Sequence, residues 1–310
     1  MQELDRNSDR VTNDFKEKIV NWIKEEIKRT SREVTLIAVT KSVGIKETNE
    51  VIKAGVRAIG ENRVEDFEKK FPHLLQVEKH FIGQIQSRKI KRIVELFDVI
   101  QSVGTIEHLW RISSEAERQQ KSIKVLLQFN ISGEKQRAGF MPDDLEEIAS
   151  AITPDSLSVN SRELPDKSKK IPAVFDVKII GVMGMASRTD DEGVVRKQFS
   201  LLKSIRDGLR TTHPTITELS MGMSDDYKIA LEEGATMLRI GRALFNLAHL
   251  FRLIYKATMN DPTLIDGEAL KRITKLGGDS LLQQIIAIFL DKVPQKIAAI
   301  KTAMAAADYE

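Results

Sequence analysis

Residues 34–41 of this chain read Val-Thr-Leu-Ile-Ala-Val-Thr-Lys, a short and mostly apolar run, Val34–Thr40, that is followed by a lysine. The apolar residues follow one another instead of alternating with polar ones, which is typical of a parallel strand buried on both faces. Further runs of this kind follow along the chain, at Ala58–Glu61, His80–Ile85, Val99–Val103, Val125–Ile131, Ile179–Met185, Leu219–Met223 and Met237–Ile240.

Stretches with helical periodicity separate most of these runs. The predicted helices are Thr48–Ala54, Lys89–Phe97, Ile106–Gln119, Asp143–Ile152, Val194–Leu209 and Asp225–Glu233, and an amphipathic helix over residues 11–28 precedes the first strand. Eight strands that alternate with helices favour a closed barrel over an open sheet. We therefore predict an α/β fold, a (β/α)8 barrel of the TIM type. No GxGxxG or GxxxxGK[ST] motif follows a strand, which argues against a nucleotide site.

Two regions depart from this alternation. Residues 153–172 are polar and contain three prolines, which predicts a surface excursion between the fifth and sixth strands. The last barrel helix is expected at Arg242–Met259, and Asn260-Asp261-Pro262 interrupts the helical pattern. We therefore expect a barrel domain over residues 1–259 and a small helical appendage over residues 260–310.

Composition narrows the functional classes. The 310 residues include 48 basic and 45 acidic side chains, which are interspersed along the chain, so no nucleic-acid partner is expected. Cysteine is absent, which excludes disulfides and thiolate chemistry, and no metal site is predicted. The N-terminus lacks an apolar signal core, and no stretch has the length of a membrane span. The sequence thus favours a cytoplasmic protein without membrane contact.

In a barrel, functional residues follow the strands at their carboxyl ends. Lys41 follows the first run, and partial desolvation there would free its amine to attack a carbonyl, although a lone lysine at a strand end is more often simply solvated. The loops after strands seven and eight, Ser220–Ser224 and Gly241-Arg242, combine glycines, hydroxyls and a helix start, features that suit a phosphate. Together the lysine and the two loops suggest a phosphorylated aldehyde as ligand.

Several motifs occur in an order and spacing that resemble a known family. They are TLIAVTK (35–41), GENRV (60–64), HFIGQIQ (80–86), NISGE (130–134), GVMGMA (181–186), LSMGMSDD (219–226) and RIGRALF (239–245). The chain resembles the pyridoxal phosphate homeostasis proteins, the YggS/PROSC group, whose barrel is similar to the N-terminal domain of alanine racemase. The resemblance covers roughly residues 8–247.

This resemblance implies pyridoxal 5'-phosphate (PLP), a form of vitamin B6, as the cofactor, bound by Lys41 as a Schiff base. It also implies that Asn62 lies beside the cofactor and that Arg239 faces the pyridine nitrogen. The implied phosphate ligands are Ser220, Met221, Ser224, Gly241 and Arg242. Arg242 departs from the family, which has a small hydroxyl residue there, and Ser102–Thr105 lacks the family's acidic residue near the end of strand four.

The implied function is storage, buffering or delivery of PLP inside the cell, with PLP-dependent apo-enzymes as candidate recipients. We expect no substrate turnover and therefore assign no catalytic residue. A PLP-dependent, racemase-like enzyme is the alternative, but racemisation needs a second base opposite the lysine. The second domain that supplies this base in alanine racemase has no counterpart here. A purely structural barrel is a third interpretation.

The C-terminal appendage resembles the opening of a histidine phosphotransfer (HPt) domain, in Ile265–Asp279 and Phe289–Pro294. Such domains carry their phospho-accepting histidine on a later helix. No histidine follows Asp261 in this chain, so we expect no phosphotransfer by the appendage. A helical hairpin that packs on the barrel or on another chain is the simpler interpretation.

Overall fold

The computed structural model describes residues 17, 19–21, 23–152 and 177–245. The chain divides into two compact units, Met1–Leu247 and Ala248–Glu310, and every described residue belongs to the first. The predicted excursion at residues 153–172, the domain boundary after residue 259 and the HPt-like appendage lie outside the described residues. So does most of the predicted helix Arg242–Met259.

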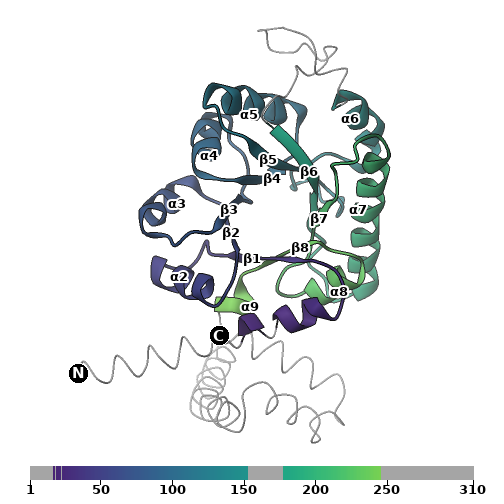
Figure 1. Cartoon of the computed structure of the whole chain (residues 1–310). Helices are drawn as coiled ribbons and strands as arrows, with labels where there is room; N and C mark the ends of the chain where they lie inside the picture. The colour runs from purple at the N-terminus through teal and green to yellow at the C-terminus, as the bar shows by residue number, and fades with distance from the viewer. Residues whose placement is uncertain (1–16, 18, 22, 153–176, 246–310) are drawn as a thin grey trace, which may run out of the picture. The chain divides into compact units, whose positions relative to one another are not determined.

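In the described part of the chain, eight parallel strands form a closed barrel in sequence order, which confirms the predicted fold (Figure 1). The strands are β1 (Thr35–Val39), β2 (Ala58–Glu61), β3 (Glu78–Phe81), β4 (Val99–Val103), β5 (Ile123–Phe129), β6 (Val177–Gly184), β7 (Glu218–Ser220) and β8 (Met237–Ile240). The barrel closes where β1 pairs with β8, with Ile37 opposite Arg239. Because all strands run the same way, their carboxyl ends open together at one end of the barrel, which we call the mouth.

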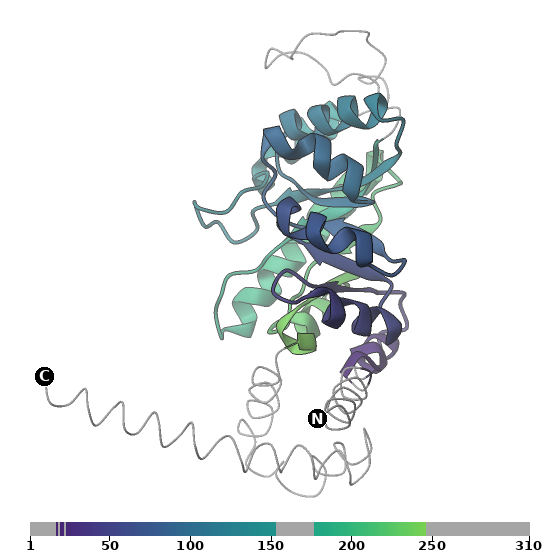
Figure 2. The ribbon, with the colours of Figure 1, turned by 90° about the vertical axis from the view of Figure 1, so that its left-hand side faces the viewer.

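Helices surround the barrel (Figures 1 and 2). They are α2 (Ile45–Lys53), α3 (Val64–Lys70), α4 (Ile90–Leu96), α5 (Ile106–Arg118), α6 (Leu145–Ala151), α7 (Glu192–Thr212), α8 (Tyr227–Glu232) and α9 (Arg242–Phe245), with the 3-10 turns η1 (Phe71–His73), η2 (Ser87–Lys89) and η3 (Pro142–Asp144). Residues 23–28, within the predicted N-terminal helix, are also helical. None of the helices in the described residues has both the length and the apolar character needed to span a membrane.

The barrel interior has an apolar layer at mid-height. One side chain from each of six strands forms it, namely Ile37, Ala58, Val99, Leu126, Met183 and Met237. Side chains alternate along a strand, so residues two positions from these also face the interior. Outside the barrel, Phe67 of α3 stacks on Phe97 with ring centroids 4.5 Å apart. Phe97 also packs edge-on against Phe81 of β3, with ring centroids 5.3 Å apart, so this aromatic group joins two helices to the sheet.

Three elements differ from the sequence-based expectations. β3 is Glu78–Phe81 instead of His80–Ile85, because the chain leaves the sheet at Gly83, where an added Cβ would lie 2.1 Å from the Asn62 carbonyl oxygen. β7 ends at Ser220 because Gly222 turns the chain with a φ of +89°. α3 was not predicted, since only Val64 and Phe67 of its residues are buried.

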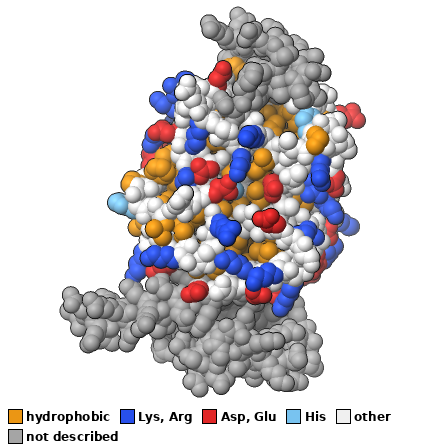
Figure 3. Space-filling model, viewed as in Figure 1, with side chains coloured by type: hydrophobic (Ala, Val, Ile, Leu, Met, Phe, Trp, Pro, Cys, Tyr) orange, Lys and Arg blue, Asp and Glu red, His pale blue; other side chains and the backbone are white. Residues whose placement is uncertain are grey.

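Charged side chains of both signs are interspersed on the barrel end drawn in Figure 3. Many of them pair across neighbouring helices, as Arg196 of α7 does with Glu232 and Glu233 at the end of α8. This distribution agrees with the interspersed charge of the sequence.

Candidate functional site

Lys41 lies directly after β1, at the mouth. The preceding residue, Thr40, is fully buried and keeps the strand in register through a hydrogen bond from its amide to the Gly60 carbonyl, 3.0 Å long. Lys41 itself is exposed, and among the described residues nothing forms a hydrogen bond or ion pair with its amine. The structure therefore places a solvent-accessible primary amine at the carboxyl end of β1.

A buried ion pair supports this strand end from the helix side. Lys70, the last residue of α3, donates to Glu61 Oε1 at 2.7 Å and to the Thr40 carbonyl at 2.8 Å. The Thr40 hydroxyl also donates to Glu61 Oε1, at 2.7 Å. The second carboxylate oxygen, Oε2, is buried with no hydrogen-bond partner among the described residues. The Lys70 charge is therefore the main compensation for a carboxylate that is out of contact with water.

Arg239 of β8 is buried inside the barrel. Its Nη1 donates to Ser220 Oγ at 2.6 Å and its Nη2 to the Gly184 carbonyl at 2.9 Å. No carboxylate of the described residues forms an ion pair with it, although the charge of Asp226 attracts it from further away. Desolvation lowers the pKa of Arg239 to about 10, so the guanidinium is still charged at neutral pH. Guanidinium has five N–H donors, and the two contacts leave others for a ligand.

The loop after β7 is tied to the start of α9. Ser224 is buried, and its Oγ accepts a hydrogen bond of 3.1 Å from the Ala243 amide. Asp226 accepts from the Met223 amide, and burial raises the pKa of the Asp226 carboxyl. Because Ser224 uses a lone pair for Ala243, its own hydroxyl hydrogen is available to an anion. The two loops that were predicted to hold phosphate therefore lie together.

The remaining predicted site residues have different surroundings. Gly241 lies against β1, where an added Cβ would be 3.3 Å from Val39 Cβ. Arg242 is exposed and forms an ion pair with Asp225. Met221 is fully buried and its amide donates to the Met237 carbonyl at 3.2 Å. Asn62 follows β2 and is partly buried, and within the described residues it forms no hydrogen bond with Lys41 or Arg239.

The Ser220 hydroxyl lacks the free hydrogen that a residue needs to donate to a phosphate. Its hydroxyl accepts from Arg239 and donates to Gln101 Oε1 at 2.8 Å, so its hydrogen is already used inside the barrel. A phosphate contact from Ser220 therefore stays a prediction. The observed role of its side chain is to join Arg239 to Gln101.

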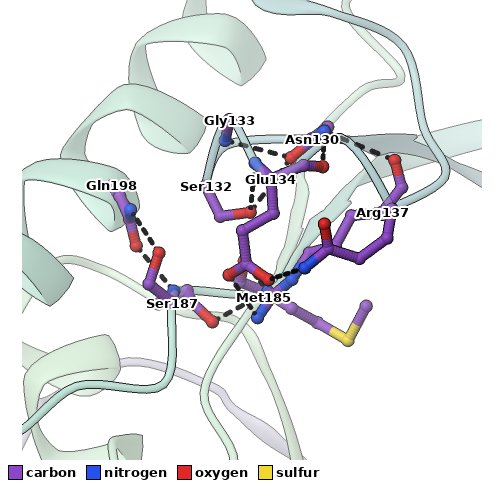
Figure 4. A network of polar contacts seen from close by, with 10 residues as sticks. Asn130, Ser132, Gly133, Glu134, Arg137, Met185, Ser187 and Gln198 are labelled. Atoms are coloured by element: carbon purple, nitrogen blue, oxygen red, sulfur yellow. Dashed lines mark hydrogen bonds and ion pairs between the residues drawn. The ribbon is translucent and has the colours of Figure 1, made fainter.

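The loops after β5 and β6 form a second polar network at the mouth (Figure 4). Asn130 Oδ1 accepts from the Gly133 amide at 3.1 Å, which closes the turn of the NISGE motif. Arg137 donates to the carbonyls of Met185 and Ala186, each at 2.8 Å, and pairs with Glu134 at 2.9 Å. Arg137 therefore fastens the β5 loop to the β6 loop.

Sequence analysis missed two groups of functional interest. The first is the Glu61–Lys70 pair. The second consists of His80 and Gln101, which are fully buried inside the barrel and linked to each other at 2.7 Å. Spacing could have found Gln101, because it lies two residues after interior Val99, just as Arg239 lies two residues after interior Met237.

Comparisons with known proteins agree on one family and one fold. The model of the alanine racemase N-terminal domain matches residues 20–249. The pyridoxal phosphate homeostasis protein of Escherichia coli K12 is 32% identical over 225 residues, covering 70% of this chain and 87% of the relative. The Vibrio alginolyticus protein of the same name is 29% identical and covers 79% and 97%. These relatives carry a homeostasis name and not an enzyme name, as expected from the sequence.

Solved structures give the same result. PipY of Synechococcus elongatus, solved with PLP bound, has a TM-score of 0.58 and 28% identity, covering 74% of this chain and 100% of PipY. Alanine racemase of Clostridium difficile 630 has a TM-score of 0.55 at 13% identity, and covers 73% of this chain and 55% of the racemase. At that identity the racemase shows a shared fold alone.

Proposed function

This chain belongs to the pyridoxal phosphate homeostasis protein family, and we propose that it binds PLP through a reversible Schiff base at Lys41 without turning over a substrate. Storage, buffering or delivery of the cofactor follows from reversible attachment, because an amine of a recipient apo-enzyme can displace the Lys41 amine. PipY, a structural relative solved with PLP bound, supports the choice of ligand.

One observation carries the proposal: an unpartnered amine and a buried cation lie on the two strands that close the barrel. Lys41 follows β1, and Arg239 belongs to β8, which pairs with β1. Buried charges in proteins are normally paired, yet no described carboxylate forms an ion pair with Arg239. A ligand with an aldehyde for Lys41 and a hydrogen-bond acceptor for Arg239 would complete both groups. The pyridine nitrogen of PLP is such an acceptor.

The phosphate of PLP has suitable donors nearby. The Ser224 hydroxyl retains its hydrogen, and it sits beside the first turn of α9, where helix amides favour an anion. Gly241, Arg242 and Met221 complete the proposed phosphate contacts, and Asn62 is proposed to lie beside the cofactor. Arg242 would first have to exchange its ion pair with Asp225, so we assign it the smallest share of the binding.

The residues determine what the bound cofactor can do. The Lys41 amine attacks the aldehyde carbon, a C=N bond forms and one water leaves, and hydrolysis reverses the step. When bound, PLP supplies an electron sink, whose strength depends on protonation of the pyridine nitrogen. Arg239 stays protonated and therefore donates a hydrogen bond without transferring its proton. The sink is accordingly weak, which suits a carrier.

The tyrosine in the described residues does not provide a second base for racemisation. Tyr227 is the tyrosine in this part of the chain, and it is buried in α8. Burial raises the pKa of Tyr227 above its ordinary value, so its phenol does not exchange a proton readily near neutral pH. Tyr227 is therefore unsuited to act opposite Lys41.

The test is the absorption spectrum of the purified full chain mixed with PLP. We expect the visible band of lysine-bound PLP in the wild-type protein and in Lys53→Ala, which removes an exposed lysine of α2. Lys41→Ala should lose the band while keeping the far-ultraviolet circular dichroism of the wild type. A band that persists in Lys41→Ala contradicts the attachment site. Racemisation of amino acids by the loaded protein, well above the rate with free PLP, contradicts the absence of turnover.

A further inference from the structure

A continuous series of polar side chains crosses the barrel interior, and we call it the interior chain. Arg239 donates to Ser220, whose hydroxyl donates to Gln101 Oε1 at 2.8 Å. The other end of the Gln101 amide, Nε2, lies 2.7 Å from His80 Nδ1. Ser220, Gln101 and His80 are each 0% exposed, so water does not compete for these bonds. The members of the interior chain up to this point come from β8, β7, β4 and β3.

The interior chain continues to the opposite end of the barrel. His80 Nε2 lies 3.0 Å from Glu78 Oε2, and Glu78 Oε1 pairs with Lys124 at 2.9 Å. Glu78 is the first residue of β3, and Lys124 is the second residue of β5. Both are therefore at the amino ends of the strands. The interior chain joins a cation at the mouth to a carboxylate at the other end.

The orientation of the Gln101 amide sets the direction of the links. Guanidinium has only donors, so Ser220 Oγ accepts from Arg239, and Gln101 turns its Oε1 to the Ser220 hydroxyl, which donates to it. The Gln101 amide nitrogen then faces His80 and donates to Nδ1. His80 must carry its hydrogen on Nε2 and donate it to the Glu78 carboxylate. Glu78 is held ionised, since the hydrogen bond from His80, opposed by burial and aided by Lys124, lowers the pKa of its carboxyl to about 2.

This one-way order has a consequence for Arg239. If His80 carried its hydrogen on Nδ1 instead of Nε2, Nδ1 would become a donor and would face the donor end of Gln101. The Gln101 amide would have to rotate, and Ser220 would lose its acceptor and be free to turn away from Arg239. The charged groups linked to His80 are Glu78 on β3 and, beyond it, Lys124 on β5. Through Gln101 and Ser220, His80 is also linked to Arg239 on β8.

We propose that His80 and Gln101 are positioning residues that hold Arg239 in its ligand-binding orientation through Ser220. The proposal rests on the proposed function, since Arg239 is taken to contact PLP. Neither residue touches the ligand. His80 accepts from Gln101 and so orients the amide, and Gln101 accepts from Ser220 and so orients the hydroxyl. The Arg239 guanidinium is thereby held with its remaining donors directed at a single acceptor. The tautomer of the buried His80 imidazole is thereby coupled to the orientation of Arg239.

The first measurement uses the protein without cofactor. Nitrogen-15 NMR of the imidazole rings distinguishes the two neutral tautomers, and His80→Gln identifies the His80 signals. We expect the Nε2–H tautomer at neutral pH in the wild type. A predominant Nδ1–H tautomer would reverse the order of donors and overturn the proposal.

The second measurement uses the PLP-loaded protein. Gln101→Leu removes the amide contacts with Ser220 and His80, together with a longer one of 3.8 Å from Nε2 to Met237 Sδ. Gln101→Asn keeps an amide that is too short to reach both Ser220 and His80. We expect each variant to bind PLP about tenfold more weakly, as for a lost hydrogen bond to a charged network, and to shift the midpoint of the pH titration of the visible band. The matched control is Gln128→Leu, which removes another buried amide of a barrel strand, bonded to the Ala138 carbonyl and outside the interior chain.

The outcomes separate the two proposals. If the wild type lacks the visible band with PLP, both the proposed function and the positioning role are contradicted. A wild-type band, with unchanged affinity and titration in a folded Gln101 variant, overturns the positioning role alone. If Gln101→Leu does not fold, Gln101→Asn decides. If Gln128→Leu shifts the titration as much as the Gln101 variants do, the effect is general to buried amides and the proposal is wrong.

Discussion

Replacement of Lys70 by methionine should destabilise the barrel, because it leaves the buried Glu61 carboxylate without a positively charged partner. The Lys70 side chain is 13% exposed and that of Glu61 is 1% exposed. Removal of one partner from a buried ion pair costs about 3–5 kcal/mol. Thr40 still donates to Oε1, whereas Oε2 already lacks a partner among the described residues, so we expect the lower end, about 3 kcal/mol.

A mutant cycle measured by urea unfolding tests this expectation. Lys70→Met should lower the free energy of unfolding by about 3 kcal/mol, and the melting temperature by roughly 6–12 °C for a barrel of this size. The double variant Glu61→Gln with Lys70→Met removes the charge and should recover more than half of the loss. Lys69→Met, at the exposed neighbouring position of α3, is the control and should change stability by less than about 0.5 kcal/mol.

Two results would refute this reasoning. One is a Lys70→Met variant as stable as the Lys69→Met control. The other is a double variant that is less stable than Lys70→Met alone. In that case the lost packing contacts of the Lys70 methylene groups would outweigh the effect of the unpaired Glu61 charge. The same variant also loses the hydrogen bond to the Thr40 carbonyl. A weaker visible band with PLP should therefore accompany the loss of stability.

Three further changes have defined outcomes. Gly222→Ala should lower the free energy of unfolding in urea by about 2–4 kcal/mol, because Gly222 has a φ of +89° and an added Cβ would lie 2.5 Å from a side chain of α8. Gly234→Ala is the control: an added Cβ there has no atom within 4 Å, and the loss should be only about 1 kcal/mol. The pKa of Glu78 is lowered from 4.5 to about 2, mainly by its hydrogen bond from His80. The ionised carboxylate therefore stabilises the fold fully above about pH 5, and this stabilisation is lost as the pH falls towards 2. Glu78→Gln should be less stable than wild type by on the order of 1 kcal/mol at neutral pH, and the difference should vanish in acid unfolding near pH 2. Ser224→Ala leaves the Ala243 amide, in the first turn of α9, without its acceptor, so the free energy of unfolding should fall by about 1 kcal/mol in thermal unfolding. The variant should also bind PLP more weakly in a spectral titration. An affinity equal to that of wild type would remove Ser224 from the proposed phosphate site.

The strands could be predicted from sequence because continuous burial leaves a local signal. β1 is apolar from Leu36 to Val39, and the predicted run, Val34–Thr40, located it to within one residue at each end. α3 gave no such signal, because a helix with two buried residues has no measurable periodicity. The end of β3 was also misplaced, since the limit is set by the approach of Gly83 to Asn62, a contact between strands.

The candidate site divides in the same way. Lys41, Ser224 and Arg239 could be named because each follows or ends a recognisable strand and because motifs at these positions resemble a known family. The interior chain could not, since the partners of Gln101 lie on β3 and β7, and no local pattern pairs residues that are far apart in sequence. Arg239 was predicted to face a ligand, but its hydrogen bond to Ser220 joins β8 to β7 and leaves no local pattern in the sequence.

The pairing of β1 with β8 also constrains how the protein is made. β1 emerges early from the ribosome, with Lys41 beside it, yet the strand that completes its second edge is translated last among the eight described strands. Until then that edge is unpaired, and an unpaired edge is open to association with other nascent chains. Arg239 and Ser224 arrive with the same late segments. Under the proposed function, a growing chain therefore has the Lys41 amine long before it has Arg239 and Ser224, and retention of PLP would report that synthesis has passed β8.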